Sequence, residues 1–173
     1  MLVLDASGGV GSYAVQLAKS VGAEVTGVSS TSKLDLVRSL GADHVVDYTR
    51  QDFAGGAHRY DLIIDTGGNP ALSRLRDALT STGTAVIVGG EGGGRWTGLR
   101  RQLRAVAVSP FLRQRLAVFV TKRRTSDLQH LIELIGAGTV TPSVDRTFPL
   151  DRVPEAMRYL EAAKARGKVV ITG

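Results

Sequence analysis

The sequence predicts an α/β protein of the Rossmann type, with a doubly wound parallel sheet of about six strands. Short apolar runs alternate with amphipathic stretches over most of the 173 residues, which is typical of strands buried on both faces between helices. A glycine-rich turn joins the first apolar run to the first amphipathic stretch. The length suffices for one main core and is too short for two full domains.

The expected strands are short runs rich in valine, isoleucine and leucine. They cover residues 2–5, 24–28, 44–47, 60–65, 84–88 and 116–121, with further extended segments at 144–150 and 168–171. Runs of this length and composition suit strands that are buried in the centre of a sheet.

The expected helices lie between these strands. They cover residues 11–21, 33–40, a segment from Pro70 onward, a segment from Ser126 to about 135, and 151–165. In the third helix, Asn69 is a plausible cap, and Leu72, Leu75 and Leu79 share one face. In the fourth, the residues expected to face inward are Leu128, Leu131, Ile132 and Ile135. Residues 95–114 combine apolar and basic side chains without a clean period and receive no assignment.

Composition limits the classes of site and location. The chain has no cysteine, and its three histidines are scattered without the spacing of a metal site, so no metal is expected. No apolar run is long enough to span a bilayer, and the amino end lacks the features of a signal peptide, so a cytoplasmic location without membrane contact is expected.

The net charge of +6 leaves a nucleic-acid surface as an alternative to consider. The basic clusters are Arg100, Arg101 and Arg104, then Arg113 and Arg115, then Lys122, Arg123 and Arg124. They lack interleaved aromatic residues and a known recognition motif, and such runs are usually solvated faces. Nucleic acid is therefore not the expected partner.

The turn from Ala6 to Gly11 is the strongest functional signal. It follows a buried strand and opens a helix, and the next strand arrives within the ~30 residues of a βαβ unit. Glycines at such a turn let the backbone approach a pyrophosphate, and the helix N-terminus offers N–H groups to it. The predicted dinucleotide contacts here are Ser7, Gly8, Gly9, Val10 and Gly11.

The tip of the second strand favours NADP(H) over NAD(H). An acidic residue normally holds the NAD ribose there, but this sequence has Ser29, Ser30, Thr31, Ser32 and Lys33. Hydroxyls and a lysine supply donors and positive charge for a 2′-phosphate. The alternative is that Ser32 only caps a helix and Lys33 points to solvent.

Further strand ends are expected at the same crevice, because ligands of open α/β sheets bind at the carboxyl ends of the strands. The candidates are Tyr48, Asp65, Thr66, Gly67, Gly89 and Gly90. Each of them is also compatible with ordinary turn chemistry. No catalytic residue emerges from the sequence.

The sequence resembles the medium-chain dehydrogenase/reductase superfamily, in particular its zinc-independent, quinone oxidoreductase-like branch of NAD(P)-dependent alcohol dehydrogenases. The resemblance rests on the turn at 6–11 with Ala14 and Gln16, on 40–43 with 46–48, and on the closing segments 145–150 and 167–170. It implies that Gly8 to Gly11 contact the pyrophosphate and that Ser30, Lys33 and Tyr48 surround the 2′-phosphate. Asp5 stands where many relatives have glycine or another small residue.

The resemblance also implies a missing part. Family members begin with a GroES-like catalytic domain, whereas this chain starts on the first Rossmann strand. Residues 1–140 would then be the NAD(P)-binding domain, and residues 141–173 a return segment of the absent catalytic domain. A natural fragment, a mis-called start and half of a split enzyme all stay open.

The expected function is the cofactor half of an NADPH-dependent oxidoreductase that transfers hydride to a carbonyl or an activated alkene such as a quinone or enone. The alternative is a non-enzymatic NAD(P)-sensing module or an inactive fragment. A methyltransferase would want an acidic second-strand tip, and no tyrosine is followed by the lysine of a short-chain dehydrogenase. The edge at the sixth strand either pairs in a homodimer or is covered by another segment.

Overall fold

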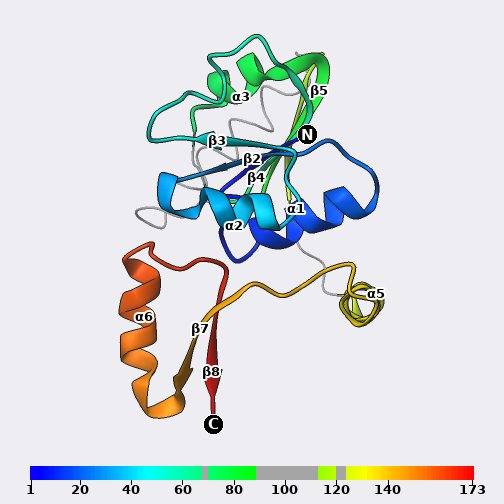
Figure 1. The fold of residues 1–173 in the computed structure, drawn as a ribbon. Coiled ribbons are helices and arrows are strands. Elements are labelled where there is room, and N and C mark those ends of the chain that lie inside the picture. Colours follow the sequence, from blue (N-terminus) through cyan, green and yellow to red (C-terminus); the bar gives the residue numbers. More distant parts are fainter. Residues whose placement is uncertain (68–69, 89–112, 120–123) are drawn as a thin grey trace.

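The computed structural model describes residues 1–67, 70–88, 113–119 and 124–173, and these contain a six-stranded parallel sheet in the order β3-β2-β1-β4-β5-β6 (Figure 1). The strands are β1 (Leu2–Leu4), β2 (Thr26–Ser29), β3 (His44–Asp47), β4 (Tyr60–Asp65), β5 (Leu79–Ile87) and β6 (Arg115–Val118). This is the Rossmann strand order, in which the direction of winding reverses between β1 and β4. The predicted fold class is therefore confirmed.

Helices cover both faces of the sheet. Helices α1 (Gly11–Ser20) and α2 (Leu34–Ser39) lie on one face, and α3 (Leu72–Ala78) lies on the other (Figure 1). Because side chains alternate along a strand, Val3 joins the cluster under α1 and α2, while Leu2 and Leu4 join the cluster on the other face. This double burial explains the uninterrupted apolar character of β1.

The third helix is shorter than its apolar spacing predicts. Leu79 was expected on the helical face with Leu72 and Leu75, but α3 ends at Ala78 and Leu79 has an extended backbone. It opens β5 and pairs with Tyr60, so its burial comes from the sheet. Strand pairing therefore overrides helical spacing at this residue. The expected cap, Asn69, lies outside the described residues.

Helix α5 (Thr125–Gly136) forms as predicted, but its expected inward face is wrong. Leu128 and Ile132 are 61% and 67% exposed, Leu131 and Ile135 are partly exposed, and no residue of this helix is buried. Figure 1 shows the helix standing away from the sheet. Helical periodicity specifies an apolar face, but it does not specify what covers that face.

The end of the chain forms a second, two-stranded parallel sheet. Strands β7 (Val144–Pro149) and β8 (Lys168–Thr172) pair directly, and α6 (Val153–Glu161) connects them. The helix ends four residues before the predicted residue 165, and Ala163 adopts a left-handed backbone with φ of 52°. The segment from Ala162 to Gly167 is therefore a bend, and we call it the C-terminal bend.

A side-chain amide ties this second sheet to the first. Gln16 of α1 donates to the carbonyl of Thr141 at 3.0 Å and accepts from the N–H of Thr141 at 2.7 Å. Both polar groups of the Thr141 backbone are thereby paired with one side chain. This contact fixes where the chain leaves the Rossmann sheet.

No helix in the described ranges is long and apolar enough to cross a membrane.

Leu75 is buried and Leu128 is exposed, so truncating them to alanine should lower the free energy of unfolding by different amounts. Leu75→Ala removes a fully buried side chain and should lower the free energy of unfolding by about 2–5 kcal/mol. Leu128→Ala removes an exposed side chain and should change it by less than about 0.5 kcal/mol. Urea unfolding followed by circular dichroism measures both, and equal losses would contradict the exposed position of α5.

Candidate functional site

The turn between β1 and α1 brings helix and strand into direct contact. The N–H of Gly8 donates to the carbonyl of Asp5 at 3.0 Å, and the N–H of Ser12 donates to the carbonyl of Gly8 at 3.1 Å. A Cβ at Gly11 would overlap the Asp5 carbonyl oxygen, so only glycine fits there. Gly11 is therefore required for the packing of α1 on β1, and its predicted contact with a dinucleotide stays a prediction.

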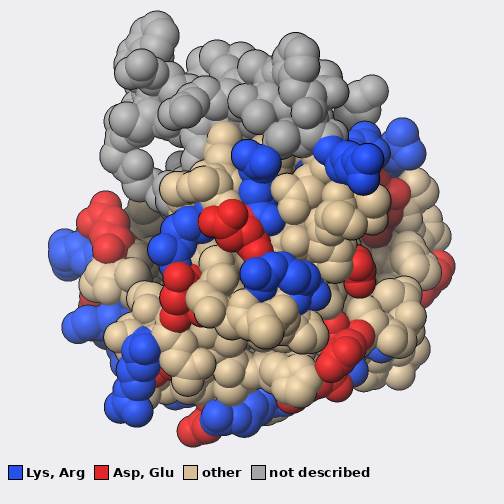
Figure 2. Space-filling model, turned by 90° about the horizontal axis from the view of Figure 1, so that it is seen from above, with Lys and Arg blue, Asp and Glu red and all other residues tan. Residues whose placement is uncertain are grey.

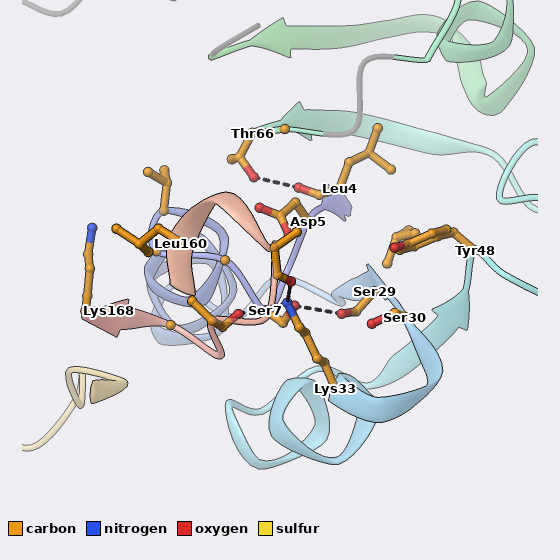
Figure 3. Close-up of a pocket in the computed structure, with 18 of the residues that line it drawn as sticks. Leu4, Asp5, Ser7, Ser29, Ser30, Lys33, Tyr48, Thr66, Leu160 and Lys168 are labelled. Atoms are coloured by element: carbon orange, nitrogen blue, oxygen red, sulfur yellow. Dashed lines mark hydrogen bonds between the residues drawn. The ribbon is translucent and has the colours of Figure 1, made fainter. Parts of the chain in front are cut away.

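Asp5 has an unusual conformation at the start of this turn. Its φ is 57°, in the left-handed region that glycine favours and that aspartate tolerates better than most residues. Its carboxylate lies beside Gly8 and Gly67, since a Cβ at Gly67 would lie 3.3 Å from Asp5 Oδ2. Figure 3 shows the side chain between the glycine turn and the loop after β4.

A cavity of about 810 Å³ opens at the carboxyl ends of β1, β2, β3 and β4 (Figure 3). Its volume is in the range of cofactor pockets. Nine of the predicted site residues line it: Ser7, Gly8, Gly9, Val10, Ser30, Lys33, Tyr48, Thr66 and Gly67. The strand-end rule thus brings together residues that are up to 60 positions apart in the sequence (67 minus 7).

Five predicted residues do not contribute to the described lining. Gly11 packs on the Asp5 carbonyl instead, and Asp65 is fully buried at the end of β4. The hydroxyl of Thr31 points to Asp47. Gly89 and Gly90 lie outside the described residues, so their placement stays a prediction.

The tips of β1 and β2 are joined by hydroxyl groups. Ser7 Oγ and Ser29 Oγ lie 2.7 Å apart in a buried position, and one of them donates to the other. Ser30 follows directly and lines the cavity, while the exposed ring of Tyr48 lies across the same opening (Figure 3). This end of the cavity therefore has hydroxyl donors and no carboxylate from the β2 tip.

Asp47, at the end of β3, organises the neighbouring loop. The Thr31 hydroxyl and the Thr49 hydroxyl both donate to its buried carboxylate, and these bonds hold the pKa of Asp47 below its usual value of 3.8. An ionised carboxylate thus anchors the turn from Thr31 to Lys33. Thr31 is a positioning residue for that turn rather than part of the cavity wall.

Lys33 lines the cavity and is held by the C-terminal bend. Its Nζ donates to the carbonyls of Ala163 at 2.9 Å and Ala165 at 2.8 Å (Figure 3). Helix α2 has no side-chain cap, and Lys33 does not point into open solvent. Both parts of the alternative interpretation of Ser32 and Lys33 are therefore wrong.

Sequence reasoning missed one whole wall of the cavity. The C-terminal wall consists of Leu160, Ala163, Ala165, Gly167, Lys168 and Val169. The motif at 167–170 can be recognised in the sequence, but no local pattern predicts that it lies against the glycine turn. Its position there follows from the tertiary contacts of Gln16 with Thr141 and of Lys33 with Ala163.

The structure contains no cluster of metal ligands among the residues that it describes. No group of three histidine, aspartate or glutamate side chains gathers among them, and the chain has no cysteine.

The face drawn in Figure 2 carries basic and acidic side chains intermixed, without a continuous basic surface in the described part.

Comparisons with known proteins agree with this geometry. The family model for zinc-binding dehydrogenases matches residues 40–171. An NADPH-dependent alkenal/one oxidoreductase from Arabidopsis thaliana is 37% identical over 99% of this chain and 40% of its own length. A 2-methylene-furan-3-one reductase from Solanum lycopersicum is 35% identical over 99% of this chain and 39% of its own length.

A solved structure of an oxidoreductase is also similar to this chain over nearly its whole length. The quinone oxidoreductase from Coxiella burnetii superposes with a TM-score of 0.85 and 26% identity, over 99% of this chain and 52% of that one. The chain therefore spans about 40% to 50% of the length of the relatives that it matches.

The hydroxyl contacts of Asp47 predict a pH effect. Thr31→Val removes the strongest of them, so the pKa of Asp47 should rise toward 3.8, as measured by NMR titration of the carboxyl carbon. Because the folded pKa is lowered, Asp47 stabilises the fold above pH 3.8, and this contribution is lost as the pH falls through the folded pKa. The variant should therefore show a weaker loss of stability below pH 3.8.

The pKa of Asp52 is the internal control for this titration. It is lowered mainly by the backbone N–H of Ala54 and should not change in Thr31→Val. An unchanged pKa of Asp47 in the variant would contradict the assigned role of Thr31.

Proposed function

Because the chain belongs to the zinc-binding dehydrogenase family, we propose that it is the NADP(H)-binding part of an oxidoreductase. The observation that carries the proposal is the cavity at the strand ends, which is lined by the glycine turn, by Val10 at the N-cap of α1 and by Lys33. A helix N-terminus favours an anionic ligand, and α1 has no acidic residue in its first turn. A dinucleotide supplies the matching phosphates.

NADP(H) is favoured over NAD(H) by the chemistry of the β2 tip. Lysine has three N–H donors, and Lys33 uses two of them on the carbonyls of the C-terminal bend. The third donor and the full positive charge are available to a 2′-phosphate beside Ser30. An acidic side chain, which would favour the ribose hydroxyls of NAD, is absent from residues 29–33.

The reaction we propose is hydride transfer to a carbonyl or an activated alkene, in keeping with the names of the two plant relatives. The bound cofactor would supply the hydride. The role of this chain is to bind the dinucleotide and to orient it along the strand ends. We propose that it does so without zinc, since its described residues offer no ligand cluster.

The substrate-binding part is proposed to lie in the length that the relatives have in addition to this chain. We assign residues 1–140 to cofactor binding and residues 141–173 to the junction with that part. We propose further that the chain forms a homodimer at the β6 side of the sheet, or that another segment covers this side. Neither nucleic acid nor a membrane is part of the proposal.

Nucleotide binding by the 173-residue chain tests the proposal. Isothermal calorimetry should show tighter binding of NADPH than of NADH. In Lys33→Met, NADPH affinity should fall about tenfold more than NADH affinity, because only NADPH carries the phosphate that pairs with the ammonium.

A control variant and two possible outcomes show how the difference between the losses of NADPH and NADH affinity is to be interpreted. Lys164→Met is the control, since Lys164 is exposed on the C-terminal bend and does not line the cavity. Equal losses for both dinucleotides in Lys33→Met would contradict 2′-phosphate recognition and leave Lys33 as an anchor of the bend. Absence of binding to the unaltered chain would contradict the proposed function.

A further inference from the structure

Lys168 lies directly over the glycine turn. A Cβ built at Gly9 would lie 3.1 Å from Lys168 Nζ and 3.2 Å from its Cδ, so the lysine side chain covers this glycine. Lys168 also lines the cavity, and its Nζ lies 5.9 Å from the centre of the Tyr13 ring in α1. Gly9 is the glycine that the spacing of the dinucleotide turn does not require. Its lack of a side chain makes room for Lys168.

The backbone holds Lys168 in this position. Its N–H donates to the carbonyl of Ser143 at 2.7 Å, which starts the pairing of β8 with β7. Gly167 has a φ of 111°, and a Cβ there would overlap Ser143. The turn into β8 thus requires glycine at position 167, and this turn places Lys168 at the cavity wall.

Lys33 fixes the other end of the same bend through the carbonyls of Ala163 and Ala165. The two lysines therefore lie on different parts of the cavity wall, Lys33 after the β2 tip and Lys168 over the β1–α1 turn (Figure 3). No ion pair joins either lysine to a carboxylate within the described ranges. Two positive charges thus face one space that also contains a helix N-terminus.

We propose that Lys168 is a second phosphate ligand of the dinucleotide and binds its pyrophosphate at the glycine turn, beside Gly9. The inference rests on the proposed function. A pyrophosphate at the turn would receive N–H donors from the N-terminus of α1 together with the Lys168 ammonium. Lys33 and Lys168 then divide the phosphates of NADPH between them, and only Lys33 distinguishes NADPH from NADH.

This division predicts two different binding patterns, measured by calorimetry on the 173-residue chain. Lys168→Met should weaken the binding of NADPH and of NADH by the same factor, roughly three- to tenfold for one exposed charge. Lys33→Met should weaken NADPH selectively. The matched control, Lys164→Met, should bind both dinucleotides as the unaltered chain does.

Salt dependence and a charge-preserving variant separate phosphate binding from a structural role. Loss of one phosphate contact should reduce the decline of affinity between low and moderate salt, whereas loss of packing should leave that decline unchanged. Lys168→Arg keeps the charge and should restore most of the affinity, and thermal melts show whether Lys168→Met is folded.

Three results would overturn the inference. They are unchanged affinity in Lys168→Met, a loss confined to NADPH, and a loss that Lys168→Arg fails to restore in a folded protein. If the unaltered chain binds neither dinucleotide, the proposed function itself fails. If it binds both and Lys168→Met does so equally well, only the role of Lys168 is wrong.

Discussion

The close contact between α1 and the end of β1 is the constraint on which the rest of the structure depends. The helix begins where its first residue, Gly11, touches the carbonyl of Asp5, and any Cβ would separate the two elements. This contact aims the helix N-terminus at the cavity and places Gln16 where it pairs with Thr141. Because Gly11 has no side chain, α1 packs directly on β1. This packing sets the position of the cavity floor and of the contact with Thr141 through which the second sheet attaches.

The cavity is built from both ends of the chain. The first 70 residues supply the glycine turn, the β2 tip and the loop after β4, and the last residues close the opposite wall. The side chains of Gln16 and Lys33 join these parts by hydrogen bonds, Gln16 through its amide and Lys33 through its ammonium. Lys33 therefore links the C-terminal bend to the place where a 2′-phosphate is proposed to bind.

Local patterns predicted the sheet, its order of elements and the glycine turn, because burial on two faces and the strand–turn–helix sequence are readable from neighbouring residues. They failed where distant contacts decide. Leu79 pairs in a strand instead of ending a helix, and no residue on the apolar face of α5 is buried in the described structure. The rule that ligands bind at the carboxyl ends of strands predicted that Tyr48, Thr66 and Lys33 share one cavity. It could not predict the place of Lys168, which lines the cavity only because of how the second sheet folds.

The central claim is that one dinucleotide contacts the glycine turn and the C-terminal bend at the same time. Amide chemical shifts of the ¹⁵N-labelled chain, which at 18.3 kDa is accessible to such measurements, test this directly during titration with NADPH. The account predicts that the amides of Gly8 to Val10 and of Ala163 to Lys168 shift together, with the same dissociation constant. Shifts at the glycine turn without shifts in the C-terminal bend would contradict it.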